Sequence, residues 1–383
     1  PQRASAARLD KQTVFRQWRH SAFGTAARPA TAGYGSAAVV RRILFASLAI
    51  APITIGLHYL ADLSETTEFV LSALALIPLA WLIGEATEHA AEHTGPWIWG
   101  FLNATFGNAP ELIIALIAVN EGLNEVVRGS LTGSVVSNLL LVLGAALLAG
   151  GRGKLDRFSS FLSLGLIAFA TVLFLIPSVP GWDGDPDRHS LAVVSTGVSV
   201  VLLIVYIAVT WHSLRRHRSM HVASDEEIAG WSLRAALGAL AIATIATALV
   251  AEILVGSLEV FSEKVGLSEF FVAAVIVAIV GNAAEHGGAV IVAFRGKIAL
   301  AGEIALSSAA QVSVFLIPAV ALLSWLIDPL SLSFRPVEIA ALAGSVVYTA
   351  LLLQSGTSSR LRGGLLLAGY AVVVVAFYLA GDR

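Results

Sequence analysis

The chain has 383 residues, of which 57% are hydrophobic and 13% are charged, and its formal net charge is −2. Soluble domains carry roughly 25% charged residues, and stretches of about twenty apolar residues are typical of transmembrane helices. The many such stretches exclude an ordinary soluble protein, and no basic excess points to a nucleic-acid partner. The absence of cysteine excludes disulfides and thiolate metal sites. We therefore expect an all-α membrane protein.

Eleven apolar windows predict eleven transmembrane helices. A basic segment, 1–40, precedes a leader helix at 41–62. Five helices follow within 68–212, predicted at 68–91, 97–120, 126–149, 158–178 and 190–212. A polar linker covers 213–231, and five more helices within 232–381 are predicted at 232–258, 269–294, 298–326, 335–353 and 362–381.

The distribution of basic residues predicts the orientation. With these spans, 19 of the 24 Lys and Arg residues fall on one side, including all those of segment 1–40. Cytoplasmic loops carry the excess of Lys and Arg, so this side is expected to be cytoplasmic. Segment 1–40 and linker 213–231 would then be cytoplasmic, and the carboxyl end would lie on the opposite side. In a prokaryote we expect the plasma (inner) membrane, and homo-oligomerisation is left open.

A short motif occurs twice, each time inside an apolar window. Its copies are Gly107-Asn108-Ala109-Pro110-Glu111 and Gly281-Asn282-Ala283-Ala284-Glu285. A carboxylate inside the membrane costs several kcal/mol, so it indicates a functional site by default. Two copies indicate an internal duplication.

Each group holds an odd number of helices, so the second group is expected to enter the membrane upside down. Inverted repeats with a midplane site at broken helices are typical of secondary transporters. Flanking polar residues recur as well: Ser134 and Asn138 follow the first copy, and Ser307, Ser308 and Gln311 follow the second. Glu85 precedes the first copy of the motif and Glu252 precedes the second, and a role in a proton path is predicted for both.

The motif supplies hard oxygen ligands. Asn108 and Glu111, like Asn282 and Glu285, are three residues apart and share a helix face. Pro110 has no amide hydrogen, so it leaves the Phe106 carbonyl without its helical partner. Ca²⁺ takes six to eight oxygens in flexible geometry, which suits this set. Two buried carboxylates close together also favour protonation, so protons and Ca²⁺ would compete for the same oxygens.

Both copies of the motif resemble the paired repeat motifs of the Ca²⁺/H⁺ exchanger (CAX) family of the Ca²⁺/cation antiporter superfamily. The resemblance covers roughly 41–381. It implies eleven helices, Ca²⁺ transport driven by H⁺, and Glu111 and Glu285 as central ligands. It also implies that the flanking polar positions line the site: Ser134, Asn138, Ser307, Ser308 and Gln311. The family often has a strongly acidic helix between its halves, whereas this linker holds only Asp225-Glu226-Glu227.

Several alternatives compete with Ca²⁺/H⁺ exchange. The first alternative is a Na⁺-coupled cation/Ca²⁺ exchanger. The resemblance implies that such Na⁺-coupled relatives have hydroxyl residues at the positions where this chain has Asn108 and Asn282. His89-Ala90-Ala91-Glu92-His93 matches an H-x-x-E-H zinc-hydrolase pattern, which would make the chain an intramembrane enzyme. That triplet lies at a helix end, lacks an evident third ligand and is not repeated, so we expect no enzyme.

A channel would pass Ca²⁺ without proton coupling. In a further alternative, the flanking Ser, Asn and Gln residues only hold packed helices together and bind no ion.

Overall fold

The computed structural model describes residues 42–94, 102, 105–217 and 231–382. Segment 1–40, most of the linker and the first turns of the predicted helix 97–120 lie outside this range. The chain divides into two units, Pro1–Ser47 and Leu48–Arg383. Within the first unit the described residues, 42–47, are helical, and the Ser47 hydroxyl donates to the Leu44 carbonyl at 2.8 Å.

The second unit is almost entirely helical. Its first half contains α3 (Ile50–Leu60), α4 (Glu65–Glu92), α6 (Ala109–Asn120), α7 (Asn124–Val136), the π-helical segment η1 (Ser137–Val142), α8 (Leu143–Gly150), α9 (Arg157–Gly181) and α10 (His189–His217). Its second half contains α11 (Leu233–Gly256), α12 (Leu258–Val265), α13 (Glu269–Phe271), η2 (Val272–Val277), α14 (Ala278–Gly281), α15 (Ala283–Phe294), α16 (Ile298–Gln311), η3 (Val312–Leu316), α17 (Ile317–Leu323), η4 (Ser324–Leu326), α18 (Pro336–Leu353) and α19 (Arg360–Ala380). Strands β1 (Gly153–Lys154) and β2 (Thr357–Ser358) pair antiparallel.

Nine helices in the described part of the chain are long and apolar enough to cross a membrane. A bent pair, Leu258–Val265 with Glu269–Gly281, is together long and apolar enough to form one broken span, and α6 is a shorter apolar helix. The predicted continuous helices 97–120 and 269–294 are interrupted at Asn108 and Asn282. A periodic apolar window does not reveal these breaks, because the residues on both sides remain apolar.

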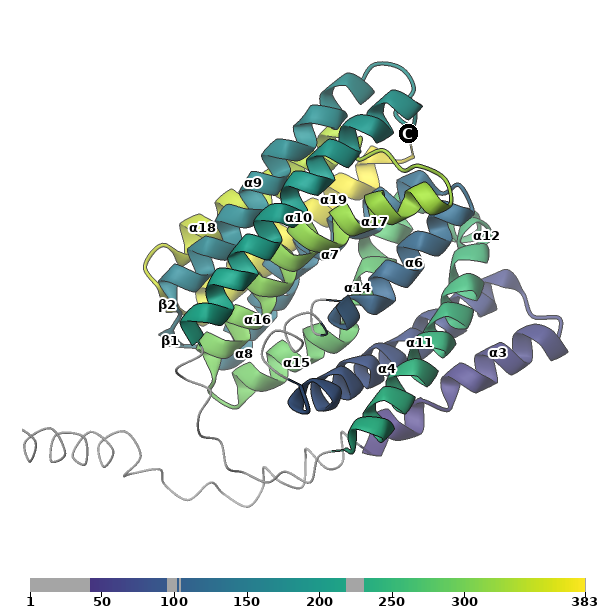
Figure 1. The fold of residues 1–383 in the computed structure, drawn as a ribbon, viewed down its shortest axis with the longest axis horizontal. Helices are drawn as coiled ribbons and strands as arrows, with labels where there is room; N and C mark the ends of the chain where they lie inside the picture. The colour runs from purple at the N-terminus through teal and green to yellow at the C-terminus, as the bar shows by residue number, and fades with distance from the viewer. Residues whose placement is uncertain (1–41, 95–101, 103–104, 218–230, 383) are drawn as a thin grey trace, which may run out of the picture. The chain divides into compact units, whose positions relative to one another are not determined.

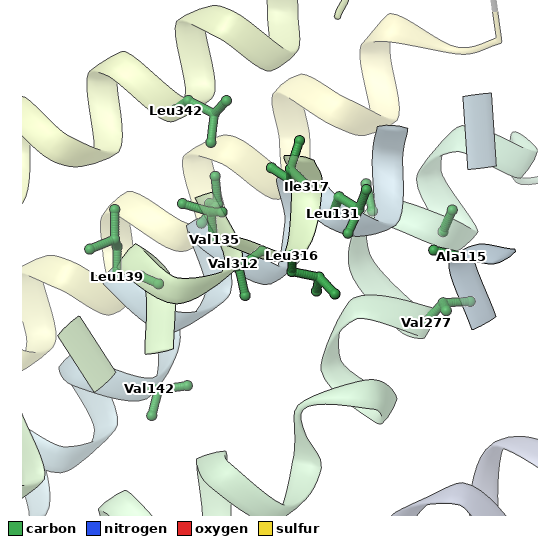
Figure 2. Close-up of a cluster of buried hydrophobic side chains, with 14 of the residues drawn as sticks. Ala115, Leu131, Val135, Leu139, Val142, Val277, Val312, Leu316, Ile317 and Leu342 are labelled. Atoms are coloured by element: carbon green, nitrogen blue, oxygen red, sulfur yellow. The ribbon is translucent and has the colours of Figure 1, made fainter. Parts of the chain in front are cut away.

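The helices form layers around a central pair (Figure 1). Helices α3, α4 and α11 pack together on one side, and α9, α10 and α18 lie on the other. Between them run the two most buried spans, Asn124–Gly150 and Ile298–Leu326, with 83% and 67% of their apolar windows buried. Figure 2 shows their contact, where Leu131, Val135 and Leu139 face Val312 and Leu316. The core of the bundle is therefore the packing of these two spans.

Matching elements of the two halves recur at a constant offset along the chain. Helices α6 and α15 have the same length. The start of α15 follows the start of α6 by the same number of residues as the start of α16 follows the start of α7. A π-helical segment follows at the corresponding place in each half, in η1 and in η3. π-Helical turns are rare and frequently mark functional sites.

Close backbone contact between the halves depends on Gly133 of α7. A Cβ atom there would lie 1.9 Å from the Ala274 carbonyl oxygen in η2. Because that obstacle is backbone, neither element can move aside without disturbing its own hydrogen bonds.

We expect Gly133→Ala to destabilise the bundle by about 1–3 kcal/mol, the usual cost of overpacking. The measurement is the thermal unfolding midpoint of the purified protein in detergent. Gly165→Ala in α9 is the control, because a Cβ there meets nothing within 4 Å. If Gly133→Ala unfolds at the same temperature as Gly165→Ala, the close approach of α7 and η2 is not a constraint.

Candidate cation-binding site

Two helix breaks lie where the duplicated motif occurs. Asn108 is the N-cap of α6, with φ −107° and ψ 20°, and Asn282 is the N-cap of α15, with φ −91° and ψ 7°. The carboxylates of Glu111 and Glu285 therefore lie in the first turn of their helices. The positive end of the helix dipole favours negative charge at this position. In Figure 1 the start of α6 lies beside α14.

Pro110 lies within the first two positions of α6 and not in the interior of a helix. At such a position the missing amide hydrogen removes no bond from within α6, because the first amides of a helix have no partner in that helix. Ala284 stands at the corresponding place in the second half, where the helix is also broken. Proline is thus not required for a break of this kind. Phe106, whose carbonyl was predicted as a ligand, packs its side chain in a small cluster with Ile83, Ala109 and Leu240.

A chain of hydrogen bonds joins the two halves at the breaks. The Asn282 amide donates to the Ser134 hydroxyl at 2.8 Å. The Asn138 amide donates to the Asn282 amide oxygen at 3.3 Å and to the Ser308 hydroxyl at 3.1 Å. Ser308 in turn donates to the Glu285 carboxylate. Ser134, Asn138, Asn282, Ser308 and Glu285 therefore form one polar cluster, to which both halves contribute.

Glu111 reaches the same region from the other break. Its Cγ atom lies 3.2 Å from the position that a Cβ on Gly281 would occupy, so the glycine allows the carboxylate to approach α14. The Glu111 and Glu285 carboxylates are close enough to interact electrostatically. The Asn108 amide crosses between the halves as well, donating to Gln311 Oε1 at 3.5 Å.

A small cavity adjoins Glu111. Its volume is about 10 Å³, and it is lined by Glu111, Ile114, Ser130, Leu131, Ser134, Val277 and Ala278. That volume is close to the minimum that holds one water molecule. Glu111 Oε2 and Asn138 Oδ1 are buried and accept no hydrogen bond from any described residue. Both oxygens are therefore available to a small cation.

Three other predicted residues have different surroundings. The Ser307 hydroxyl donates to the Ile304 carbonyl of its own helix at 3.2 Å. Glu85 Oε1 lies 3.8 Å from His89 Nε2, and Glu252 is exposed on α11. The predicted proton-path role of these two glutamates stays a prediction.

The histidines of the zinc-hydrolase pattern contact the start of the second half. His93 Nε2 lies 2.9 Å from the Trp231 carbonyl oxygen, and the His89 ring stacks on the Trp231 ring at 5.2 Å. No group of three His, Cys, Asp or Glu residues arranged to hold a metal ion occurs among the described residues. These contacts fix α4 to the segment preceding α11, and they do not favour a zinc hydrolase.

The sequence analysis missed a second buried charge network, which is centred on Arg128 in the predicted helix 126–149. Arg128 lies within α7, only 1% exposed, and its Nη1 donates to Asp187 Oδ1 at 2.6 Å. One turn further on, Thr132 donates to the Glu338 carboxylate at 3.1 Å. Glu338 also accepts the Arg335 backbone amide at 2.7 Å, which caps the start of α18. Pro336 at the first position of α18 and Glu338 in its first turn were readable signals for that helix start.

Comparison with known proteins places the chain in a family. The sodium/calcium exchanger protein family model matches residues 65–215 and 235–379. A Ca²⁺/H⁺ antiporter of Synechocystis sp. is 37% identical over 362 residues, covering 88% of this chain and 97% of the relative. The Ca²⁺/H⁺ antiporter ChaA of Bacillus subtilis is 37% identical, covering 81% of this chain and 92% of the relative.

Solved structures agree with this assignment. Native YfkE is 34% identical with a TM-score of 0.75, and the match covers 88% of this chain and 99% of that one. The H⁺/Ca²⁺ exchanger CAX has a TM-score of 0.67 at 17% identity, covering 89% of this chain and 92% of that one, which is a likeness of fold alone. The chain belongs to the sodium/calcium exchanger protein family and, within it, to the Ca²⁺/H⁺ exchangers of the CAX type.

Proposed function

We propose that this protein exchanges Ca²⁺ for H⁺ across a membrane at one site shared by its two halves. The observation that carries the proposal is the pair of carboxylates, Glu111 and Glu285, at two helix breaks that interlocking hydrogen bonds join. Two relatives at 37% identity are named Ca²⁺/H⁺ antiporters, and their names support Ca²⁺ and H⁺ as the exchanged ions.

The oxygens around the breaks suit Ca²⁺ as substrate. Glu111 and Glu285 supply charge, and the side-chain oxygens of Asn108, Asn282 and Gln311 supply neutral ligands. Ser134, Asn138, Ser307 and Ser308 complete the proposed set, together with the Phe106 carbonyl. Ca²⁺ tolerates this mixture, whereas Mg²⁺ requires a small octahedral arrangement and gives up its waters reluctantly.

Competition between Ca²⁺ and protons couples the two fluxes. Two ionised carboxylates close together repel each other and have lost part of their hydration, so the empty charged site is unfavourable inside the membrane. Either Ca²⁺ or protons on Glu111 and Glu285 relieve that cost. The site therefore changes its exposure only when it carries Ca²⁺ or protons, which is the condition for obligatory exchange. Glu85 and Glu252 are proposed to pass protons between the site and the solution.

The proposed mechanism of alternating access rests on inverted repeats. The nine spans, the bent pair and α6 would make eleven transmembrane segments, a leader helix and two groups of five. The constant offset between α6 and α15 and between the starts of α7 and α16 supports the duplication. Repeats of opposite orientation can exchange conformations around a fixed midplane site. The basic side is proposed to be cytoplasmic, with the carboxyl end opposite.

Neutralising either central carboxylate should abolish exchange. We expect Glu111→Gln and Glu285→Gln each to lose Ca²⁺ flux in vesicles with an imposed pH gradient, because an amide cannot balance the charge of Ca²⁺. Glu263→Gln is the matched control, because Glu263 is exposed on α12 and should keep its flux. Near-normal flux in either site variant would remove that carboxylate from the mechanism.

The coupling ion is tested separately. We expect a pH gradient to drive Ca²⁺ into vesicles, and a Na⁺ gradient at clamped pH to produce no uptake above that of protein-free vesicles. The two asparagines at the breaks offer amides where the family resemblance implies hydroxyls for Na⁺. Robust uptake driven by Na⁺ alone would favour the Na⁺-coupled alternative.

The Phe106 carbonyl is tested by Pro110→Ala, which supplies an amide hydrogen that can engage it. If the carbonyl is a ligand, Ca²⁺ binding should weaken by about 1–3 kcal/mol, typical of a buried polar group that loses its partner. Calorimetric Ca²⁺ titration of the purified protein measures this, with Pro318→Ala at the start of α17 as control. Equal affinities in both variants would exclude the carbonyl from the site.

A further inference from the structure

An open cavity of about 470 Å³, which shares no lining residue with the cation site, lies where α8 ends and α19 begins. It is lined by Gly150, Gly151, Arg152, Ser359, Arg360 and Leu361. The apolar spans of the chain end here, since one candidate span stops at Gly150 and another starts at Arg360. The cavity therefore opens where the apolar part of the bundle meets its polar end.

The strand pair holds the two arginines of this cavity in place. Gly153 of β1 pairs with Ser358 of β2, and the Ser358 hydroxyl donates to the Gly151 carbonyl at 2.8 Å. Gly151 has φ 70°, and Arg360 Nε lies 3.6 Å from the position of a Cβ on it. Arg152 and Arg360, which are distant in sequence, are thus carried on neighbouring, hydrogen-bonded loops.

The positive charge around the cavity is not neutralised within the described structure. Arg152, Lys154, Arg157 and Arg360 are all exposed, and none forms a salt bridge or side-chain hydrogen bond with another described residue. The nearby Asp156 caps α9 by accepting the Ser159 amide. A guanidinium pair of this kind binds phosphate oxygens in bidentate geometry.

Apolar side chains adjoin the basic cavity. Leu361 lines it and is 74% exposed, and Leu148 on α8 is 43% exposed. Helix α19 lies against α8 at this point, because a Cβ on Gly363 would be 2.5 Å from the Leu148 backbone nitrogen. A free inorganic anion would make no favourable contact with these leucines, whereas the acyl chains of a phospholipid would cover them.

We propose that this cavity binds the phosphate of an anionic phospholipid between Arg152 and Arg360, with the acyl chains against Leu148 and Leu361. Basic pockets at the ends of transmembrane helices are suited to anionic headgroups, and the arginines supply both charge and hydrogen-bond donors. The inference is independent of the ion that the protein transports.

The test is a lipid titration of the purified full chain in detergent, read by native mass spectrometry and by the thermal unfolding midpoint. The probes are dioctanoyl phosphatidylglycerol, dioctanoyl phosphatidylcholine and inorganic phosphate. We expect phosphatidylglycerol to bind the parent and to raise its unfolding midpoint, and the other two probes to do neither. In Arg152→Gln/Arg360→Gln its affinity should fall at least about tenfold, since each arginine near an anionic lipid contributes about 1 kcal/mol.

The matched control is Arg295→Gln/Lys297→Gln, which removes the same charge from two exposed residues that do not line the cavity. It should bind phosphatidylglycerol as the parent does. Each single variant, Arg152→Gln and Arg360→Gln, tests the site if the double variant does not fold. Unchanged affinity in the cavity variants would overturn the proposal, as would equal losses in the control. Inorganic phosphate binding as tightly as the lipid would assign a free-anion site instead.

Discussion

The proposed mechanism depends on a pair of carboxylates, one buried and one partly buried, inside a membrane-spanning bundle. Glu111 and Glu285 lie at the first turns of broken helices, where amide and hydroxyl groups surround them. Without a bound cation or protons their repulsion and lost hydration would oppose the packing of the bundle. The site is therefore proposed to be occupied throughout the transport cycle, and the identity of the occupant changes with the side to which it opens.

The fold brings the breaks together by very close packing of small residues. Gly281 leaves room for the Glu111 side chain, and Gly133 allows α7 to lie against the backbone of η2. The hydrogen bonds then cross between the halves: Asn282 reaches Ser134, and Asn108 reaches Gln311. This crossing explains how two copies of a motif, each with one carboxylate, could form one site for a divalent cation.

The sequence was sufficient for the repeated motif, most of the helix spans and the family. It did not reveal that Asn108 and Asn282 are helix breaks, because a break without proline, as in the second copy, leaves no compositional trace. The buried position of Arg128 was also invisible, since Asp187 and Glu338, which interact with it, are distant in sequence and only tertiary packing brings them near. Ser307 matched the motif pattern, yet its hydroxyl is bonded within its own helix.

The most direct test of the shared site is the number of Ca²⁺ ions bound per chain at equilibrium, measured on purified protein at a pH where the carboxylates ionise in the presence of Ca²⁺. One ion per chain for the parent, and none for either Glu111→Gln or Glu285→Gln, is the result that a single site made by both halves predicts. Two ions per chain, or one ion retained after either substitution, would contradict it and would indicate an independent site in each half.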